Sequence, residues 1–152
     1  MPGLEDLYRE IILDHYRTPR NRGELPPPAA HAVGHNPLCG DEIDVYLQVE
    51  NDIVTDVKVG GQGCSISQSS ASMMSQAIKG HSVAEVRALA RRFKGMMSIE
   101  EEAPEGEQAP DAEIKLGDLE ALQGVVKFPV RIKCATLAWN TLIEALAEAT
   151  SV

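Results

Sequence analysis

The chain has 152 residues, of which 43% are hydrophobic, and a formal net charge of −9. A chain of this length typically buries about 70% of its unfolded surface and folds without disulfide staples. No apolar run approaches the ~18 residues of a membrane span, and the N-terminus lacks the basic and then apolar layout of a signal peptide. With 4% aromatic residues and no basic stripe, we expect a cytoplasmic protein that binds neither nucleic acid nor membrane.

The first half of the chain predicts a helix followed by a hairpin. Apolar residues recur at helical spacing over 4–16, which predicts an amphipathic helix, and the proline-rich run after it predicts an extended connector. Apolar and polar residues then alternate over 42–50 and again over 53–59, with Asn51-Asp52 between the two runs. Period-two alternation on both sides of a short turn predicts an antiparallel hairpin with one solvated face.

The second half predicts helices. The glycines after residue 59 end the strand, and the Ser, Ala and Met residues that follow suit a packed helix. Ser82 with Glu85 three residues later forms a capping box for the next helix, and Pro129 precedes a long run of apolar residues at helical spacing. Asp118 is expected to cap a short helical turn between them. The predicted class is therefore α+β, with a small antiparallel sheet of about three strands and helices packed on one face.

The negative charge is concentrated in one segment. Residues 98–113 contain seven acidic residues, prolines and a glycine, but no Lys or Arg. Such a composition is typical of a solvated loop rather than of an acidic docking site. We therefore predict one domain over 1–152 with an acidic loop insertion at about 98–115.

The three cysteines are the residues that indicate chemistry. An odd number of cysteines fits poorly with a secreted disulfide framework and better with reduced thiols. Cys39 lies in the turn before the first predicted strand, Cys64 follows the second strand, and Cys134 lies near the start of the last helix. Because the start of one hairpin strand lies beside the end of the next, Cys39 and Cys64 can meet.

The surroundings of these cysteines favour thiolates. A helix N-terminus carries a partial positive charge, which is expected to act on Cys64 and Cys134, and two cationic residues, Arg131 and Lys133, lie close to Cys134 in sequence. Three thiolates with Asp41 would complete a tetrahedral shell for Zn(II) or for one iron of an iron-sulfur cluster. A carboxylate is a harder and less tenacious ligand than a thiolate, so this shell could open one position for exchange.

Simpler interpretations exist for each residue taken alone. A single cysteine is more often a small buried hydrophobic residue than a ligand, and Gly40-Asp41 is a common turn pair. The spacing includes no C-x-x-C motif, and among the histidines only His35 lies beside the predicted site. The residues alone therefore leave a metal site and a structural role for the cysteines both open.

Three motifs together resemble the IscU/SufU family of iron-sulfur cluster assembly proteins. They read NPLCGD, GQGCSISQSSASMM and RIKCATLAW, and they occur in the order found in that family. The resemblance implies an α+β fold in which Cys39, Asp41, Cys64 and Cys134 gather at one exposed end and bind zinc or a cluster. Lys133 stands where many IscU-type members have a histidine, and this residue and the acidic segment resemble the SufU branch.

The SufU-like resemblance implies a sulfur-transfer protein rather than a stand-alone enzyme. The implied function is a zinc-bound acceptor of persulfide sulfur from a cysteine desulfurase, with Cys39 as the acceptor. Arg131, one helical turn before Cys134 in sequence, is expected either to steer or pair with a partner carboxylate or the nascent persulfide, or to be a solvated charge at the helix end. The alternative is a scaffold that binds a transient [2Fe-2S] cluster through Cys39, Cys64 and Cys134 and passes it to apo iron-sulfur proteins or carriers. A structural zinc module and a cysteine hydrolase are further alternatives, although the hydrolase lacks a recognisable histidine base.

Overall fold

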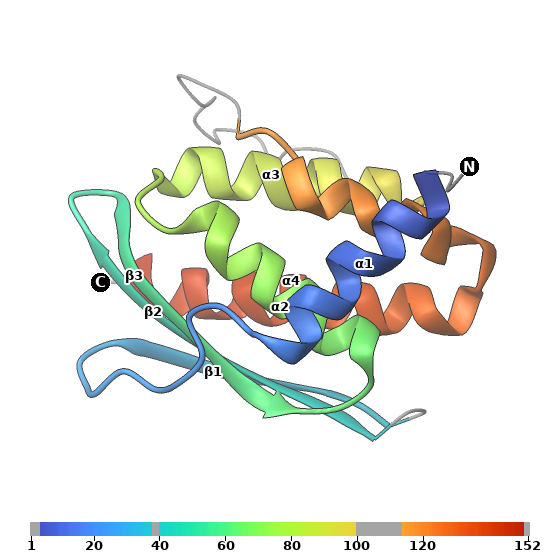
Figure 1. The fold of residues 1–152 in the computed structure, drawn as a ribbon. Helices are drawn as coiled ribbons and strands as arrows, with labels where there is room; N and C mark the ends of the chain where they lie inside the picture. The colour runs from blue at the N-terminus through green and yellow to red at the C-terminus, as the bar shows by residue number, and fades with distance from the viewer. Residues whose placement is uncertain (1–3, 38–39, 100–113, 151–152) are drawn as a thin grey trace.

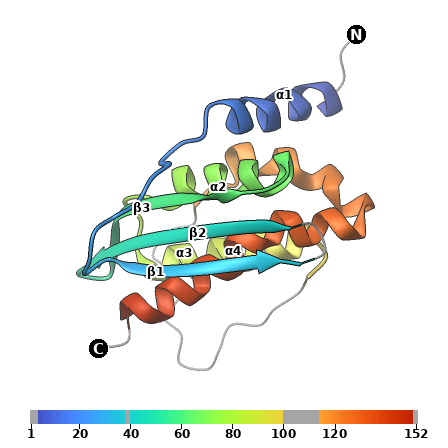
Figure 2. The ribbon, with the colours of Figure 1, turned by 90° about the horizontal axis from the view of Figure 1, so that it is seen from below.

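A three-stranded antiparallel sheet forms one layer of the protein. The strands follow the order β1-β2-β3, with β1 at Ala30–Asn36, β2 at Asp41–Glu50 and β3 at Ile53–Gln62. Figure 1 shows the helices stacked on one side of the sheet, and Figure 2 shows β1 and β2 from the other side. This layering confirms the predicted α+β class with a three-stranded antiparallel sheet.

Helices form the second layer. The computed structural model describes residues 4–37, 40–99 and 114–150. The described helices are α1 (Leu4–Arg17), α2 (Ser65–Ile78), α3 (Val83–Met96), the 3₁₀ helix η1 (Gly117–Lys127) and α4 (Pro129–Thr150). Helix α4 packs against β1 and β2, while α2 packs against β3 and lies between α1 and α4. No helix within these described ranges is long and apolar enough to cross a membrane.

The predicted hairpin is formed by β2 and β3. On β2, Ile43, Val45 and Leu47 are fully buried, whereas the residues between them are only partly buried. Asn51 and Asp52 both adopt positive φ, at 52° and 63°, as the tight turn between the strands requires. The strand register therefore places the start of β2 beside the end of β3, which is where the chain enters α2.

The hydrophobic core lies between the sheet and the helices. Phe93 of α3 stacks on Trp139 of α4, with ring centroids 4.7 Å apart and an interplanar angle of 19°. The Trp139 indole N–H donates to Ser70 Oγ at 3.2 Å, and the Ser70 hydroxyl donates to the Ala135 carbonyl at 2.6 Å. Phe93, Trp139, Ser70 and Ala135 are all buried. The two hydrogen bonds satisfy the Trp139 and Ser70 donors, as buried polar groups require.

Helix α2 is rich in buried serines because it is covered on both sides. Ser69 donates to the carbonyl of Ile12 in α1, while Ser70 donates to α4 on the opposite side. Small hydroxyl side chains allow α1 and α4 to approach closely and still satisfy buried oxygen atoms. The buried serines of this helix are Ser67, Ser69, Ser70, Ser72 and Ser75.

Helix α3 begins with the predicted capping box. Ser82 Oγ accepts a hydrogen bond from the Glu85 backbone N–H at 3.1 Å. The Glu85 carboxylate lies 2.8 Å from His81 Nδ1, and the His81 hydrogen bond is the main cause that lowers the pKa of Glu85, with Ser82 contributing and burial opposing. The cap that was predicted from the sequence is therefore confirmed.

Three details of the sequence interpretation are corrected. Asp118 does not cap η1, which begins after Leu116 without a side-chain cap; the Asp118 carboxylate instead lies 2.8 Å from His15 Nε2 of α1. Residues 30–36, to which the sequence analysis assigned no element, form β1. The connector before β1 does not continue the helix, as expected, but it contains turns at residues 20–21 and 27–28 rather than running extended throughout. It covers the edge of β3 through a bond from the Val59 N–H to the Asn21 carbonyl at 2.9 Å.

Candidate metal centre

Three of the predicted ligands lie together at one end of the sheet. Asp41, Cys64 and Cys134 each present one ligand atom, and these atoms all lie within 4.8 Å of one another. Asp41 is the first residue of β2, Cys64 is the residue before α2, and Cys134 is in α4. Three segments that are distant in sequence therefore bring two thiols and one carboxylate to the same point.

The hairpin register and the α2 entry hold Asp41 against Cys64. Asp41 Oδ1 accepts the Cys64 backbone N–H at 2.9 Å, and Asp41 Oδ2 lies 3.7 Å from Cys64 Sγ. One carboxylate oxygen thus fixes the orientation of Asp41 while the other points toward the thiols. Hydrogen bonds that orient a ligating carboxylate in this way are typical of metal sites.

Gly63 allows this close approach. A Cβ atom at position 63 would collide with the Asp41 carboxylate, and it would lie 2.7 Å from Ser67 Oγ. Real Cβ atoms essentially never approach other heavy atoms this closely, so a side chain at position 63 would displace Asp41 or Ser67. Glycine is therefore required by the carboxylate next to it.

Cys134 comes from the helical layer, whereas Asp41 comes from the sheet. Its Sγ lies 3.9 Å from Asn36 Nδ2, which donates to the sulfur, and 3.7 Å from the Val130 carbonyl of the preceding helical turn. Cys134 lies in the second turn of α4, which begins at Pro129, whereas the charge at a helix N-terminus acts mainly within the first turn. The expected effect of the α4 N-terminus on this thiol is therefore reduced, and the Asn36 amide is the donor that the structure provides.

The cluster is open on the Cys64 side. Cys64 is exposed, whereas Asp41 and Cys134 each expose only 2% of their surface. Of these three residues, Cys64 is therefore the one most accessible to an approaching molecule. A buried carboxylate and a buried thiol that face one exposed thiol are a donor set suited to a metal ion held near the surface.

The donor geometry fits zinc. Zinc binds thiolate sulfur at about 2.3 Å and carboxylate oxygen at about 2.0–2.2 Å in tetrahedral sites, which places neighbouring ligand atoms about 3.5–3.8 Å apart. The distance from Asp41 Oδ2 to Cys64 Sγ is already 3.7 Å. Because all three ligand atoms lie within 4.8 Å of one another, shifts of about 1 Å would bring them to this spacing.

The other predicted site residues have different outcomes. Cys39 lies outside the described residues. Arg131 is exposed, and its guanidinium carbon lies 5.0 Å from the centroid of the Phe128 ring. Lys133 and His35 are also exposed. The predicted role of Arg131 remains a prediction.

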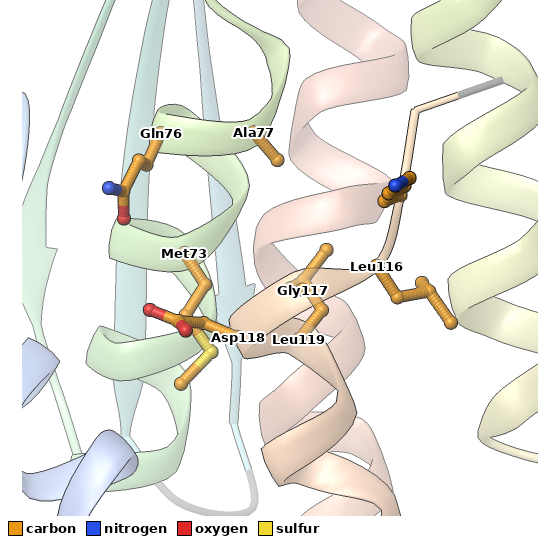
Figure 3. A pocket seen from close by; sticks show the side chains of 8 residues that line it. Met73, Gln76, Ala77, Leu116, Gly117, Asp118 and Leu119 are labelled. Carbon is orange, nitrogen blue, oxygen red and sulfur yellow. The ribbon is translucent and has the colours of Figure 1, made fainter.

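Arg131 also lines a groove between the helices. This groove has a volume of about 510 Å³, and its apolar lining comes from α1, α2, η1 and Phe128. Arg9, Lys127 and Arg131 are the cationic residues along it, and Ser65 and Ile66 connect it to the start of α2 beside Cys64. A second hollow, of about 230 Å³, lies around Met73 and Asp118 (Figure 3), more than two helical turns along α2 from Cys64.

Asn36 and Ser67 support the cluster and were not identified from the sequence. Asn36 is 98 residues from Cys134, so no local period connects the two. Ser67 donates to the Cys64 carbonyl at 3.1 Å and places its Oγ 3.8 Å from Cys64 Sγ. The only signal for either residue is its position within three residues of a predicted ligand, Asn36 before Cys39 and Ser67 after Cys64.

The fold and the cluster define an α+β protein with a candidate metal-binding group of two cysteines and one aspartate near its surface. Residues 7–135 match the family described as the NifU-like N terminal domain, and the chain belongs to this family, which includes the IscU and SufU proteins. It is 47% identical over 146 residues to the "Zinc-dependent sulfurtransferase SufU" of Bacillus subtilis, covering 96% of this chain and 93% of the relative. It is 41% identical to the "Iron-sulfur cluster assembly scaffold protein IscU" of Streptococcus pyogenes, covering 94% of this chain and 84% of that one.

Solved structures share the fold over nearly the whole chain. A protein of the SUF system from Fervidobacterium islandicum matches with a TM-score of 0.76 and 29% identity, covering 95% of this chain and 99% of that one. A NifU-like protein (N-terminal) from Brucella abortus matches with a TM-score of 0.78 and 25% identity, covering 96% of each chain. The resemblance inferred from the three cysteine motifs is therefore confirmed.

Proposed function

We propose that this protein accepts sulfur from a cysteine desulfurase for iron-sulfur cluster assembly and that it depends on zinc. The observation that carries the proposal is the convergence of Asp41, Cys64 and Cys134 within 4.8 Å at an open end of the protein. The 47% identity to a relative named as a zinc-dependent sulfurtransferase supports the same function. A location in the cytoplasm, where thiols stay reduced, is part of the proposal.

Asp41, Cys64 and Cys134 would hold the zinc ion, together with Cys39. Bound zinc would keep the thiols deprotonated and would bring no redox chemistry of its own. The Cys64 N–H, the Asn36 amide and the Ser67 hydroxyl orient these ligands from the protein side. The short distances among the described donors favour one ion per chain.

Cys39 is the proposed acceptor of sulfur. Its thiolate attacks the outer sulfur of the persulfide on the desulfurase, so a new S–S bond forms on Cys39 as the S–S bond of the donor breaks. The donor cysteine leaves as a thiolate, and the persulfide proton passes to solvent or stays on the transferred sulfur. No external oxidant or reductant is required, because the sulfane sulfur keeps its oxidation state throughout.

Arg131 is proposed to steer the partner. Its guanidinium lies at an exposed position three residues before Cys134, along the groove that also contains Arg9 and Lys127. Phe128 and Val130 next to it are exposed by 51% and 57%. Large apolar side chains beside cations are typical of a docking surface for a partner with apolar and acidic residues.

A single-turnover transfer assay tests the proposal. A desulfurase loaded with radioactive sulfur is mixed with the full chain, and the label on each protein is separated and counted. We expect near-stoichiometric transfer to the wild type, less than about one tenth of it to Cys39→Ala, and slower transfer to Arg131→Gln than to Arg17→Gln. Equal labelling of Cys39→Ala, with its fold confirmed by circular dichroism, would show that the acceptor assignment is wrong.

A cluster scaffold is the second candidate function. It is supported by relatives named as IscU scaffold proteins, at 41% identity in Streptococcus pyogenes and 40% in Thermotoga maritima. In this function the cysteines would bind a [2Fe-2S] cluster for transfer to apo iron-sulfur proteins or carriers. Intact transfer of a reconstituted cluster to an apo-ferredoxin, without sulfur acceptance in the assay above, would favour the scaffold over the sulfur acceptor.

A further inference from the structure

A polar pocket lies next to the candidate metal centre. It is formed where the connector after α1 passes the end of β3 and the first turn of α2, and it has a volume of about 440 Å³. Gly63 is shared by the pocket wall and the metal centre, because its neighbour is Cys64 and Asp41 lies against it. The lining residues are Tyr16, Pro19, Arg22, Gly61, Gln62, Gly63 and Gln68.

Arg22 brings a positive charge to the pocket. Its Nη1 donates to Gln68 Oε1 at 2.9 Å, and its Nη2 donates to the Gly61 carbonyl at 2.6 Å. Both acceptors are neutral, and no carboxylate pairs with Arg22 among the residues that the structure describes. The two bonds hold the guanidinium in place, and in the described part of the chain neither of them neutralises its charge.

Gln68 supplies a donor that lacks a partner. The residue is 92% buried, with 8% of its surface exposed, and its Nε2 makes no hydrogen bond within the described ranges. The orientation of the amide is set by Arg22, because turning it over would direct the NH₂ group at the guanidinium N–H. A buried donor without an acceptor is costly, so a small turn of this side chain toward the pocket would let a ligand oxygen satisfy it.

We propose that this pocket binds the carboxylate of an acidic side chain on the sulfur donor protein. One guanidinium and one amide provide a single positive charge and several N–H donors, which match a monoanion. A phosphate dianion would call for more cations than the one that this pocket provides. Tyr16 and Pro19 provide the apolar walls that the methylene groups of an Asp or Glu side chain would contact.

This inference deepens the proposed function, because it names a contact between the donor protein and the same end of the molecule. The glycines at positions 61 and 63 present no side chain to the pocket, so the backbone of a partner can approach the segment that leads into Cys64. A carboxylate anchored on Arg22 and Gln68 would thereby align the donor with the exposed side of the metal centre. Binding of the carboxylate itself requires neither a desulfurase nor sulfur transfer.

Nuclear magnetic resonance of the full chain tests the pocket directly. The probe is N-acetyl-glutamate amide, which carries one side-chain carboxylate, and the matched control is N-acetyl-glutamine amide, which is neutral and nearly isosteric. We expect saturable shifts of the Gln68 side-chain NH₂ resonances with the carboxylate, at a dissociation constant of about 1–10 mM at low salt. The neutral control should produce no saturable shift.

Variants of the lining residues test whether the shift caused by the carboxylate probe arises from binding in this pocket. Arg22→Gln and Gln68→Met should each weaken binding of the carboxylate at least about fivefold, whereas Arg17→Gln, an exposed arginine at the end of α1, should leave it within twofold. Thermal unfolding confirms that each variant is folded. Equal responses to the two probes, or no saturable response up to about 100 mM, overturn the proposal.

A carboxylate can reach this pocket on a protein side chain or on a free amino acid. Alanine, a free amino acid, distinguishes these two sources. We expect alanine to bind no more tightly than N-acetyl-glutamate amide, because its ammonium group is repelled by Arg22. Tighter binding of alanine would overturn the assignment to a protein side chain. Failure of sulfur transfer in the labelling assay, with intact binding of N-acetyl-glutamate amide, would contradict the proposed function and leave the carboxylate pocket standing.

Discussion

The Asp41 carboxylate contacts both the backbone N–H and the side-chain sulfur of Cys64. Oδ1 accepts the Cys64 N–H at 2.9 Å, and Oδ2 lies 3.7 Å from the Cys64 sulfur. The strand that begins at Asp41 and the helix that follows Cys64 are therefore joined at the residues proposed to bind metal. This relationship makes the metal centre sensitive to the local backbone, and Gly63 is the position where that sensitivity can be measured.

Replacing Gly63 with alanine should weaken metal binding. The new Cβ would collide with the Asp41 carboxylate, so a ligand would move, and changes in the residues that orient ligands typically cost about 10–100-fold in metal affinity. Gly95→Ala is the matched control, because a Cβ there meets nothing within 4 Å. Competition with a chromogenic zinc chelator provides the affinities, and equal affinities of the two variants would contradict the structural account of Gly63.

The two described thiols should differ in reactivity when no metal is bound. Cys64 is exposed and Cys134 is buried, so iodoacetamide should modify Cys64 at least about tenfold faster in metal-free protein. Peptide mass spectrometry after timed quenching distinguishes the two sites. Adding zinc before the reagent should protect both, and modification of Cys64 at an unchanged rate would indicate that its sulfur is not a ligand.

Ser70→Ala should destabilise the core by about 1–3 kcal/mol, because the buried Trp139 indole N–H would lose its acceptor. Urea unfolding followed by circular dichroism measures this change. A double-mutant cycle provides the control: in a Trp139→Phe background, which has no indole donor, Ser70→Ala should cost less. An equal cost in both backgrounds would assign the effect to Ser70 alone rather than to the pair.

Glu85 should make stability depend on pH. The hydrogen bond from His81 lowers the pKa of Glu85 in the folded protein, so its stabilising contribution is complete above its usual value near 4.5 and is lost as the pH falls through the lowered pKa. Glu85→Gln should therefore cost about 0.3–1 kcal/mol near neutral pH, and the difference from wild type should disappear in acid. Glu144→Gln, at an exposed position within α4, should show a much smaller difference.

Local patterns predicted most of the fold. Alternation of apolar and polar residues located the hairpin, and the Ser82 and Glu85 pair located the start of α3, because both signals lie within a few residues of the feature they predict. The alternation fails at the start of β3, where Val54 is buried and Thr55 is exposed beside a register shift in β2. The strand β1 was missed because AHAVGHN contains two alanines and a glycine and only one large apolar residue. Gly34 is required in that strand by packing, since a Cβ there would collide with Thr141 of α4.

The metal centre could be predicted only in part. Cys64 and Asp41 follow from the hairpin, since the register brings the two strand ends together. Cys134 joins them through the packing of α4 on the sheet, and its contact with Asn36 spans 98 residues, so it could be inferred only from the motif set as a whole. The bond between His15 and Asp118 spans 103 residues and was missed for the same reason.

Metal content per chain tests the central claim most directly. The full chain is purified without added iron and analysed by inductively coupled plasma mass spectrometry, alongside Asp41→Ala, Cys64→Ser, Cys134→Ser and the control Arg17→Gln. The account predicts about one zinc per chain in the wild type and in the control, and a clear loss in each of the three ligand variants. Wild-type protein without zinc, or ligand variants that retain it fully, would contradict the claim that these side chains form a zinc site.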